Sequence, residues 1–422
     1  MNVIERAECL LDSGSSGNMN FTVIAVYRGP LDAKTLEAGL AALQARHLLL
    51  RSSITWQGNT SQFSPTSQPV PVLVQPLPAD QVQAWKPPAK SALRQRFDDD
   101  GEPLWRVTWL RGDACGQLLL TFHHAVADGL SAMALVQQLF QHLGAGLNAG
   151  NATELAGVLK EQAPDLEQSF KTDRYGAFAV RSIPDRRDAG LTTGYVLEEL
   201  PAEASRALLG WSRERRVRLN ATLQAAFLQA LVAGGWLPSA TTTHTVVNLR
   251  GLAQPALSWG LMRLLRVCVD APIEVDPAAP LDGLARQLHQ VLQDQLRDGK
   301  PIMALNTITA ALEDSPSPQE LWRRSWREGG LITNLGRVPV QAHHGVMELV
   351  SMFFVANIEP IALPDKPLAV LGALTFRERL MLTCFHIEQQ MNENEAMALM
   401  ADMKRRLLAA TRFTPSPTAD PG

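Results

Sequence analysis

Apolar residues in this chain alternate between short continuous runs and runs at helical spacing, and one junction between the two is especially clear. Residues 117–122 form an apolar run of strand length, which is typical of a buried strand. Apolar residues then recur at helical spacing, at Leu130, Met133, Ala134, Val136, Leu139 and Phe140. Between these two runs the chain therefore passes from the end of a strand into the beginning of a helix.

The same two patterns extend over most of the chain and predict a mixed α/β fold. Strands are predicted over residues 20–27, 104–110, 193–200, 245–250, 331–338, 347–358, 368–376 and 380–386. Helices are predicted from a cap at Asp32 to about Arg46, over 202–216, over 220–233 with Asn220 as cap, over 281–297 and over 394–410. The order strand, helix, hairpin strands, strand, helix recurs loosely in both halves. Segment 104–110 is expected to pair with the strand over 117–122 through a hairpin at residues 111–116.

Length and charge limit the class of protein. With 422 residues the chain exceeds the usual size of a single core, so we expect two domains. An apolar content of 46% and a charged content of 19% are those of an ordinary globular protein. A formal charge of −3, a pI near 6.3 and the lack of a basic stripe argue against a nucleic-acid partner.

The cysteines and the apolar runs indicate a compartment. Cys9, Cys115, Cys268 and Cys384 are far apart in sequence and form no CxxC pair, so we expect reduced thiols and no zinc site. The N-terminus lacks the apolar stretch of a signal peptide, and no run of eighteen apolar residues occurs. These features predict a cytoplasmic protein without a membrane span.

The junction between strand and helix carries the side chains with chemical potential. Neighbouring side chains at a strand end point to opposite faces, so His123 and His124 are not expected to share a metal. If His124 faces a cavity, its near-neutral pKa suits it to take a proton from a hydroxyl or amine; the alternative is a packed histidine beside an ordinary helix cap. Asp128 is a natural cap for the helix, and it could orient the imidazole directly or hold the turn through another partner. A second pair, His343-His344, has no Asp-Gly at this spacing and is predicted to lie in a loop.

The residues His123-His124, three intervening residues and then Asp128-Gly129 resemble the HHxxxDG signature of a known superfamily. It comprises condensation domains and thioester-dependent acyltransferases, including polyketide-associated acyltransferases and alcohol acetyltransferases. The resemblance implies that His124 is the base, that Asp128 has a mainly structural role, and that His123 and Gly129 support them. No metal ligand is implied.

The resemblance also implies an architecture of two chloramphenicol-acetyltransferase-like α/β subdomains in a V-shaped pseudo-dimer, with a tunnel between them. The corresponding division is an N-terminal subdomain over residues 1–165, a crossover linker over 166–190 and a C-terminal subdomain over 191–412. A disordered tail is expected over 413–422, where the sequence is rich in proline, serine and threonine.

Three further residues gain a role from the resemblance. Arg250 ends a predicted strand and resembles an arginine of the superfamily that pairs with the motif aspartate. The resemblance therefore implies an ion pair between Arg250 and Asp128. Without the resemblance, Arg250 could equally be a surface arginine. Thr333 and Asn334 resemble a strand end beside the tunnel. They could donate hydrogen bonds to the thioester carbonyl oxygen as its charge develops, or they could form a plain turn.

The function that the resemblance implies is acyl transfer. The donor would be acyl-CoA or an acyl-phosphopantetheine arm, with an acyl carrier protein as a further partner, and the acceptor an alcohol or amine. No bound cofactor is implied, no GxSxG elbow is present, and a monomer is expected. The alternatives are a catalytically silent docking module with the same fold, an amide-forming condensation or cyclisation enzyme, and a hydrolase that uses the same base.

Overall fold

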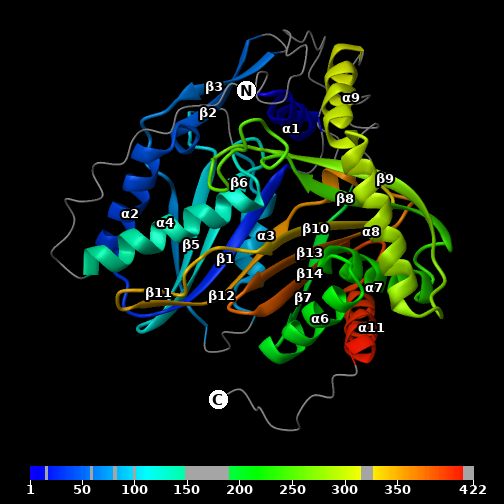
Figure 1. Ribbon diagram of the computed structural model, residues 1–422. Coiled ribbons are helices and arrows are strands. Elements are labelled where there is room, and N and C mark those ends of the chain that lie inside the picture. The colour runs from blue at the N-terminus through cyan, green and yellow to red at the C-terminus, as the bar shows by residue number, and fades with distance from the viewer. Residues whose placement is uncertain are drawn as a thin grey trace.

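Two six-stranded β-sheets and the helices packed on them form the two halves of the protein, which lie side by side (Figure 1). The computed structural model describes residues 1–14, 18–57, 60–78, 83–97, 101–147, 190–314 and 327–411, and all structural statements refer to these. The predicted mixed α/β fold with two sheet-bearing halves is confirmed.

The first sheet has the strand order β11-β12-β1-β6-β5-β4. Its central strands β1 and β6 are antiparallel, with Asn20 opposite His123 at one end, and the predicted hairpin joins β5 to β6. Helices α2 and α4 pack on each other, and α4 also packs on β1. The elements of this half are α1 (Val3–Gly14), β1 (Asn20–Arg28), α2 (Ala33–Arg46), η1 (Leu48–Arg51), β2 (Ser52–Gln57), β3 (Thr60–Pro65), β4 (Val72–Pro76), α3 (Lys86–Arg94), β5 (Trp105–Arg111), β6 (Cys115–His123) and α4 (Gly129–Leu147).

The second sheet has the strand order β7-β14-β13-β10-β8-β9. Strand β10 runs parallel to β8 and β13, and the other pairs are antiparallel. Helices α6, α7, α8 and α11 gather together on this half (Figure 1). Its elements are β7 (Thr193–Leu200), α6 (Ala202–Glu214), α7 (Leu219–Ala233), β8 (Ala240–Asn248), β9 (Arg266–Glu274), α8 (Leu281–Arg297), α9 (Lys300–Asp314), β10 (Gly329–Arg337), η3 (Glu359–Ile361), β13 (Leu368–Phe376), β14 (Arg379–Ile387) and α11 (Glu393–Thr411).

Two strands from the second half of the sequence complete the first sheet. Strand β12 (Met347–Ala356) pairs with β1, and the short strand β11 (His343–His344) pairs with β12. The prediction that His343 and His344 lie in a loop was therefore wrong, because both pair with the beginning of β12. Residues 191–412 were predicted to form the C-terminal subdomain; within this range β11 and β12 pair in the first sheet, and β12 also packs against β13 and β14 of the second.

The remaining domain boundaries stay a prediction. Most of the crossover over 166–190 and the tail over 413–422 lie outside the described residues. Among the described helices, none is long and apolar enough to cross a bilayer.

Local sequence explains where two of the helices begin. The Asp32 carboxylate accepts a hydrogen bond from the Thr35 N–H at 2.7 Å, so the predicted cap of α2 is confirmed. The predicted cap at Asn220 was wrong. Helix α7 begins at Leu219, and the carbonyl of Arg218 accepts the first helical hydrogen bonds, from Ala221 and Thr222.

Candidate functional site

The turn between β6 and α4 positions the two motif histidines. Strand β6 ends at His123, and the His124 N–H continues the pairing for one residue by donating to the Met19 carbonyl at 2.7 Å. Helix α4 begins at Gly129, where an added Cβ would lie 2.8 Å from Leu335 of β10. With glycine at this position the helix approaches Leu335 closely, and a larger residue would force the Leu335 side chain to shift.

His124 has a fixed ring with one nitrogen left available. Its Nδ1 lies 2.9 Å from the Ala127 carbonyl, which can only accept, so Nδ1 carries the proton and Nε2 keeps its lone pair. Among the residues that the structure describes, no group hydrogen-bonds to Nε2. The Phe21 ring lies beside the imidazole, with 4.7 Å between ring centroids, and limits its rotation. The side chain is partly exposed and lines a cavity.

His123 points into the core instead, as expected for neighbouring residues at a strand end. Its ring is 2% exposed, and its Nδ1 accepts a hydrogen bond from the Ala125 N–H at 3.0 Å. The protonated Nε2 faces the Asp12 carboxylate of α1 at 3.7 Å. His123 therefore ties the strand end to the N-terminal helix and does not reach the cavity.

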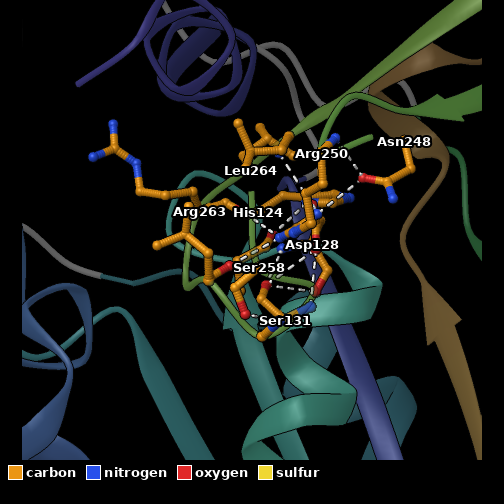
Figure 2. Close-up of polar contacts among 12 residues, drawn as sticks. His124, Asp128, Ser131, Asn248, Arg250, Ser258, Arg263 and Leu264 are labelled. Carbon is orange, nitrogen blue, oxygen red and sulfur yellow. Dashed lines mark hydrogen bonds and ion pairs between the residues drawn. The ribbon is translucent and has the colours of Figure 1, made fainter. Parts of the chain in front are cut away.

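Asp128 is the centre of a buried polar network (Figure 2). Its carboxylate accepts from both terminal nitrogens of Arg250, at 2.6 and 3.0 Å, and from the Leu265 N–H at 3.0 Å. The same carboxylate caps α4 by accepting from the Ser131 N–H at 3.0 Å. Asp128 thus holds the turn through these partners rather than by orienting the imidazole, which decides between the two roles that the sequence left open.

Arg250 joins the two halves at this point. The predicted ion pair with Asp128 is confirmed as a two-pronged contact, and the guanidinium is 3% exposed. Its Nη2 also donates to the Leu261 carbonyl at 2.9 Å, so the arginine holds the segment that precedes β9. A buried pair of this kind chiefly fixes geometry, because desolvation offsets much of its Coulomb energy.

Thr333 and Asn334 come from β10 and line the same cavity. The Asn334 side-chain oxygen accepts from the Gly336 N–H at 2.8 Å, which leaves the amide NH₂ as its free donor group. The structure thus brings His124, Asp128, Gly129, Arg250, Thr333 and Asn334 together around one space.

The cavity between the halves has a volume of about 100 Å³. Several lining residues were missed by the sequence reasoning, namely Phe21, Leu130, Val246, Asn248, Leu265, Arg266, Leu335, Phe354 and Ala356. The strand that carries Phe21 was predicted, but its pairing with Phe122, next to the motif, is seen only in the structure. Among the described residues that line the cavity, only His124 and the fully engaged Asp128 are metal-ligand types.

Charge and burial set the protonation state of His124. Burial, with the nearby Arg266 guanidinium, lowers the pKa of His124 to about 4, and the Glu8 carboxylate opposes this shift. The imidazole is therefore neutral at physiological pH, as a base must be before it accepts a proton.

The N-terminal helix α1 clamps the segment that leads into β9. The Glu5 carboxylate, which is fully buried, binds Arg263 through two contacts of 2.6 and 2.8 Å. The Glu8 carboxylate binds Arg266 at 2.7 Å. These two arginines flank Leu265, whose N–H reaches Asp128, so α1 supports the polar network from outside.

The protein has a chloramphenicol-acetyltransferase-like fold, with two sheet-bearing halves and a cavity between them that His124 lines. Two family models match successive parts of the chain. The condensation domain matches residues 10–158, and the phthiocerol/phthiodiolone dimycocerosyl transferase C-terminus matches residues 194–385. The first part of the chain is therefore similar to condensation domains, and the second part is similar to the C-terminus of this transferase.

Solved structures share the fold over nearly the full length. Polyketide synthase associated protein 5 from Mycobacterium tuberculosis is 16% identical, with a TM-score of 0.67, and the match covers 97% of this chain and 99% of that one. Trichothecene 15-O-acetyltransferase from Fusarium sporotrichioides is 14% identical, with a TM-score of 0.71, and the match covers 96% and 94% of the two chains.

Curated relatives are much longer proteins. A linear gramicidin synthase protein from Brevibacillus parabrevis is 25% identical over 276 residues, which is 60% of this chain and 4% of that protein. Chondramide synthase from Chondromyces crocatus is 30% identical over 223 residues, which is 47% of this chain and 6% of that protein. The chain thus spans only a small fraction of the length of these relatives.

Proposed function

We propose that the protein transfers an acyl group from a thioester to an alcohol or amine, with His124 as the general base. The observation that carries this proposal is the Nε2 lone pair of His124. The Ala127 carbonyl fixes the tautomer, and the ring lines the cavity between the two halves. The match to condensation-domain and acyl-transferase family models supports the reaction class.

In this mechanism the His124 Nε2 takes the proton of the acceptor hydroxyl or amine while its oxygen or nitrogen attacks the thioester carbonyl. The tetrahedral intermediate then expels the thiolate as the carbon–sulfur bond breaks, and His124 returns the proton to the sulfur. General-base catalysis of this type contributes about 10²–10⁴-fold. The Thr333 hydroxyl and the Asn334 amide are the side-chain donors proposed for the developing oxyanion, since both line the cavity.

The proposed donors are acyl-CoA or an acyl-phosphopantetheine arm on a carrier protein, and no bound cofactor takes part. The thioester carbonyl and the attacking atom would meet beside His124, in the cavity between the two halves. Asp128 and Arg250 act by fixing the turn and the interface, as their mutual contacts indicate.

A screen of acyl-CoA and acyl-pantetheine donors against alcohols and amines, read by mass spectrometry, tests the proposal. The expected result is an ester or amide that forms only when both substrates are present. Free acid without acceptor would indicate a hydrolase, and products from amines alone would indicate an amide-forming condensation enzyme. Thiol release no faster than in buffer, across the panel, would favour a silent docking module.

A further inference from the structure

A second group of reactive side chains lies on the β8–β9 ribbon, outside the cavity. These strands are antiparallel, with His244 opposite Asp270 and Val246 opposite Cys268. Because side chains alternate along a strand and opposite residues share a face, His244, Cys268 and Asp270 project from one face of the sheet. Sequence reasoning missed this group, because its members come from two strands and lack the close spacing of a metal motif.

The Oδ1 oxygen of Asp270 lies at the centre of the group. It is 2.7 Å from the His244 Nδ1 and 3.5 Å from the Cys268 sulfur. The three possible ligand atoms all lie within 4.8 Å of one another. The other ring nitrogen of His244, Nε2, donates to the Glu328 carbonyl at 2.9 Å, which fixes the ring with Nδ1 toward the two neighbours.

We propose that His244, Cys268 and Asp270 form a binding site for a divalent metal ion of the zinc type. Imidazole nitrogen, thiolate and carboxylate are the ligands that zinc binds, at about 2.0–2.3 Å. Metal-binding histidines nearly always donate their other N–H to a carbonyl or carboxylate, as His244 does here. The Asp270 side chain is 45% exposed, so it is the ligand that would move to admit an ion between its oxygen and Nδ1.

A surface groove lies next to the site along the two strands. Beyond the His244–Asp270 pair, the next pair on the same face is Thr242 and Pro272, and both line a surface groove of about 700 Å³. Zinc sites that bind water or a substrate have three coordinating side chains and leave the fourth position open. Toward the other end of the same two strands, Val246 and Arg266 line the His124 cavity. The ion would therefore lie on the sheet face between the groove and this cavity.

The Arg327 guanidinium acts electrostatically on Cys268, and its positive charge disfavours a cation at this site. Affinity for the ion is therefore expected to increase when Arg327 is replaced by glutamine.

Titration of the full-length protein with Co²⁺ tests the site without any substrate. We expect one ion per chain and a thiolate-to-cobalt absorption band in the near ultraviolet. Cys268→Ser should abolish the band, and Asp270→Asn, at an exposed position, should weaken binding at least about 10-fold. The matched control Cys115→Ser should change neither. Lack of stoichiometric binding, or a band that survives in Cys268→Ser protein with wild-type circular dichroism, would overturn the proposal.

Discussion

Replacing Asp128 by asparagine should damage the fold more than the chemistry. The two carboxylate oxygens accept from Arg250, Leu265 and Ser131, and Asp128 is only 5% exposed. An amide group in this position would direct its own hydrogens at a guanidinium that also donates, and it would leave the arginine charge buried without a counter-charge.

The size of this effect follows from the burial of both partners. Arg250 is 3% exposed and keeps only carbonyl and amide acceptors once the carboxylate is lost. Removing one member of a buried ion pair costs about 3–5 kcal/mol. We expect a loss of this order in the free energy of unfolding for Asp128→Asn, and a coupling energy of about 2–3 kcal/mol in a cycle with Arg250→Met.

Urea denaturation followed by circular dichroism measures these quantities. The ion pair between Arg206 and Glu378 is a matched control, because both side chains are 54% exposed and the same cycle should give less than about 1 kcal/mol. If Asp128→Asn unfolds like the wild type while turnover falls steeply, the structural role assigned to Asp128 is wrong.

Three further predictions concern the surroundings of the base. Burial lowers the pKa of His124 to about 4 from an ordinary 6.5, so the imidazole stays neutral in mild acid. We therefore expect kcat/KM to stay level down to about pH 5 and then to fall. A midpoint near pH 6.5 would contradict this. Gly129→Ala should raise KM, because its new methyl group would push Leu335 into the cavity. Leu335→Ala in the same chain should then restore KM. If the double variant has the same KM as Gly129→Ala alone, displacement of Leu335 is not the cause. Glu5→Gln should lower the free energy of unfolding by about 3 kcal/mol, because Arg263 loses a fully buried partner. An unchanged urea midpoint would show that α1 does not hold the segment that leads into β9.

Much of the fold was predictable from periodicity, because most of the elements in this chain are strongly patterned. Strand β6, which ends at His123, the hairpin from β5 to β6 and helices α2, α8 and α11 lie close to their predicted positions. Errors arose where the local signal was ambiguous. The hydrogen-bonding side chain of Asn220 suits a cap, yet in the structure it follows the first residue of the helix.

Long-range pairing was beyond the reach of sequence pattern. Nothing in the sequence of β12 distinguishes pairing with β1 from pairing within its own half, since its apolar residues suit either sheet. The clamp of Glu5 on Arg263 joins residues 258 positions apart, and it was missed for the same reason. The local motif around His124 was found because strand end, turn and helix start are contiguous in sequence.

The most direct measurement compares two neighbouring variants, His124→Gln and His123→Gln, in transfer from a thioester that the wild type uses. His124 lines the cavity with a free nitrogen, and His123 is 2% exposed and tied to Asp12. We predict that His124→Gln lowers kcat by about 10²-fold or more with an unchanged melting temperature, whereas His123→Gln lowers the melting temperature and keeps most of kcat. A His124→Gln enzyme that turns over at near the wild-type rate would contradict the assignment of His124 as the base.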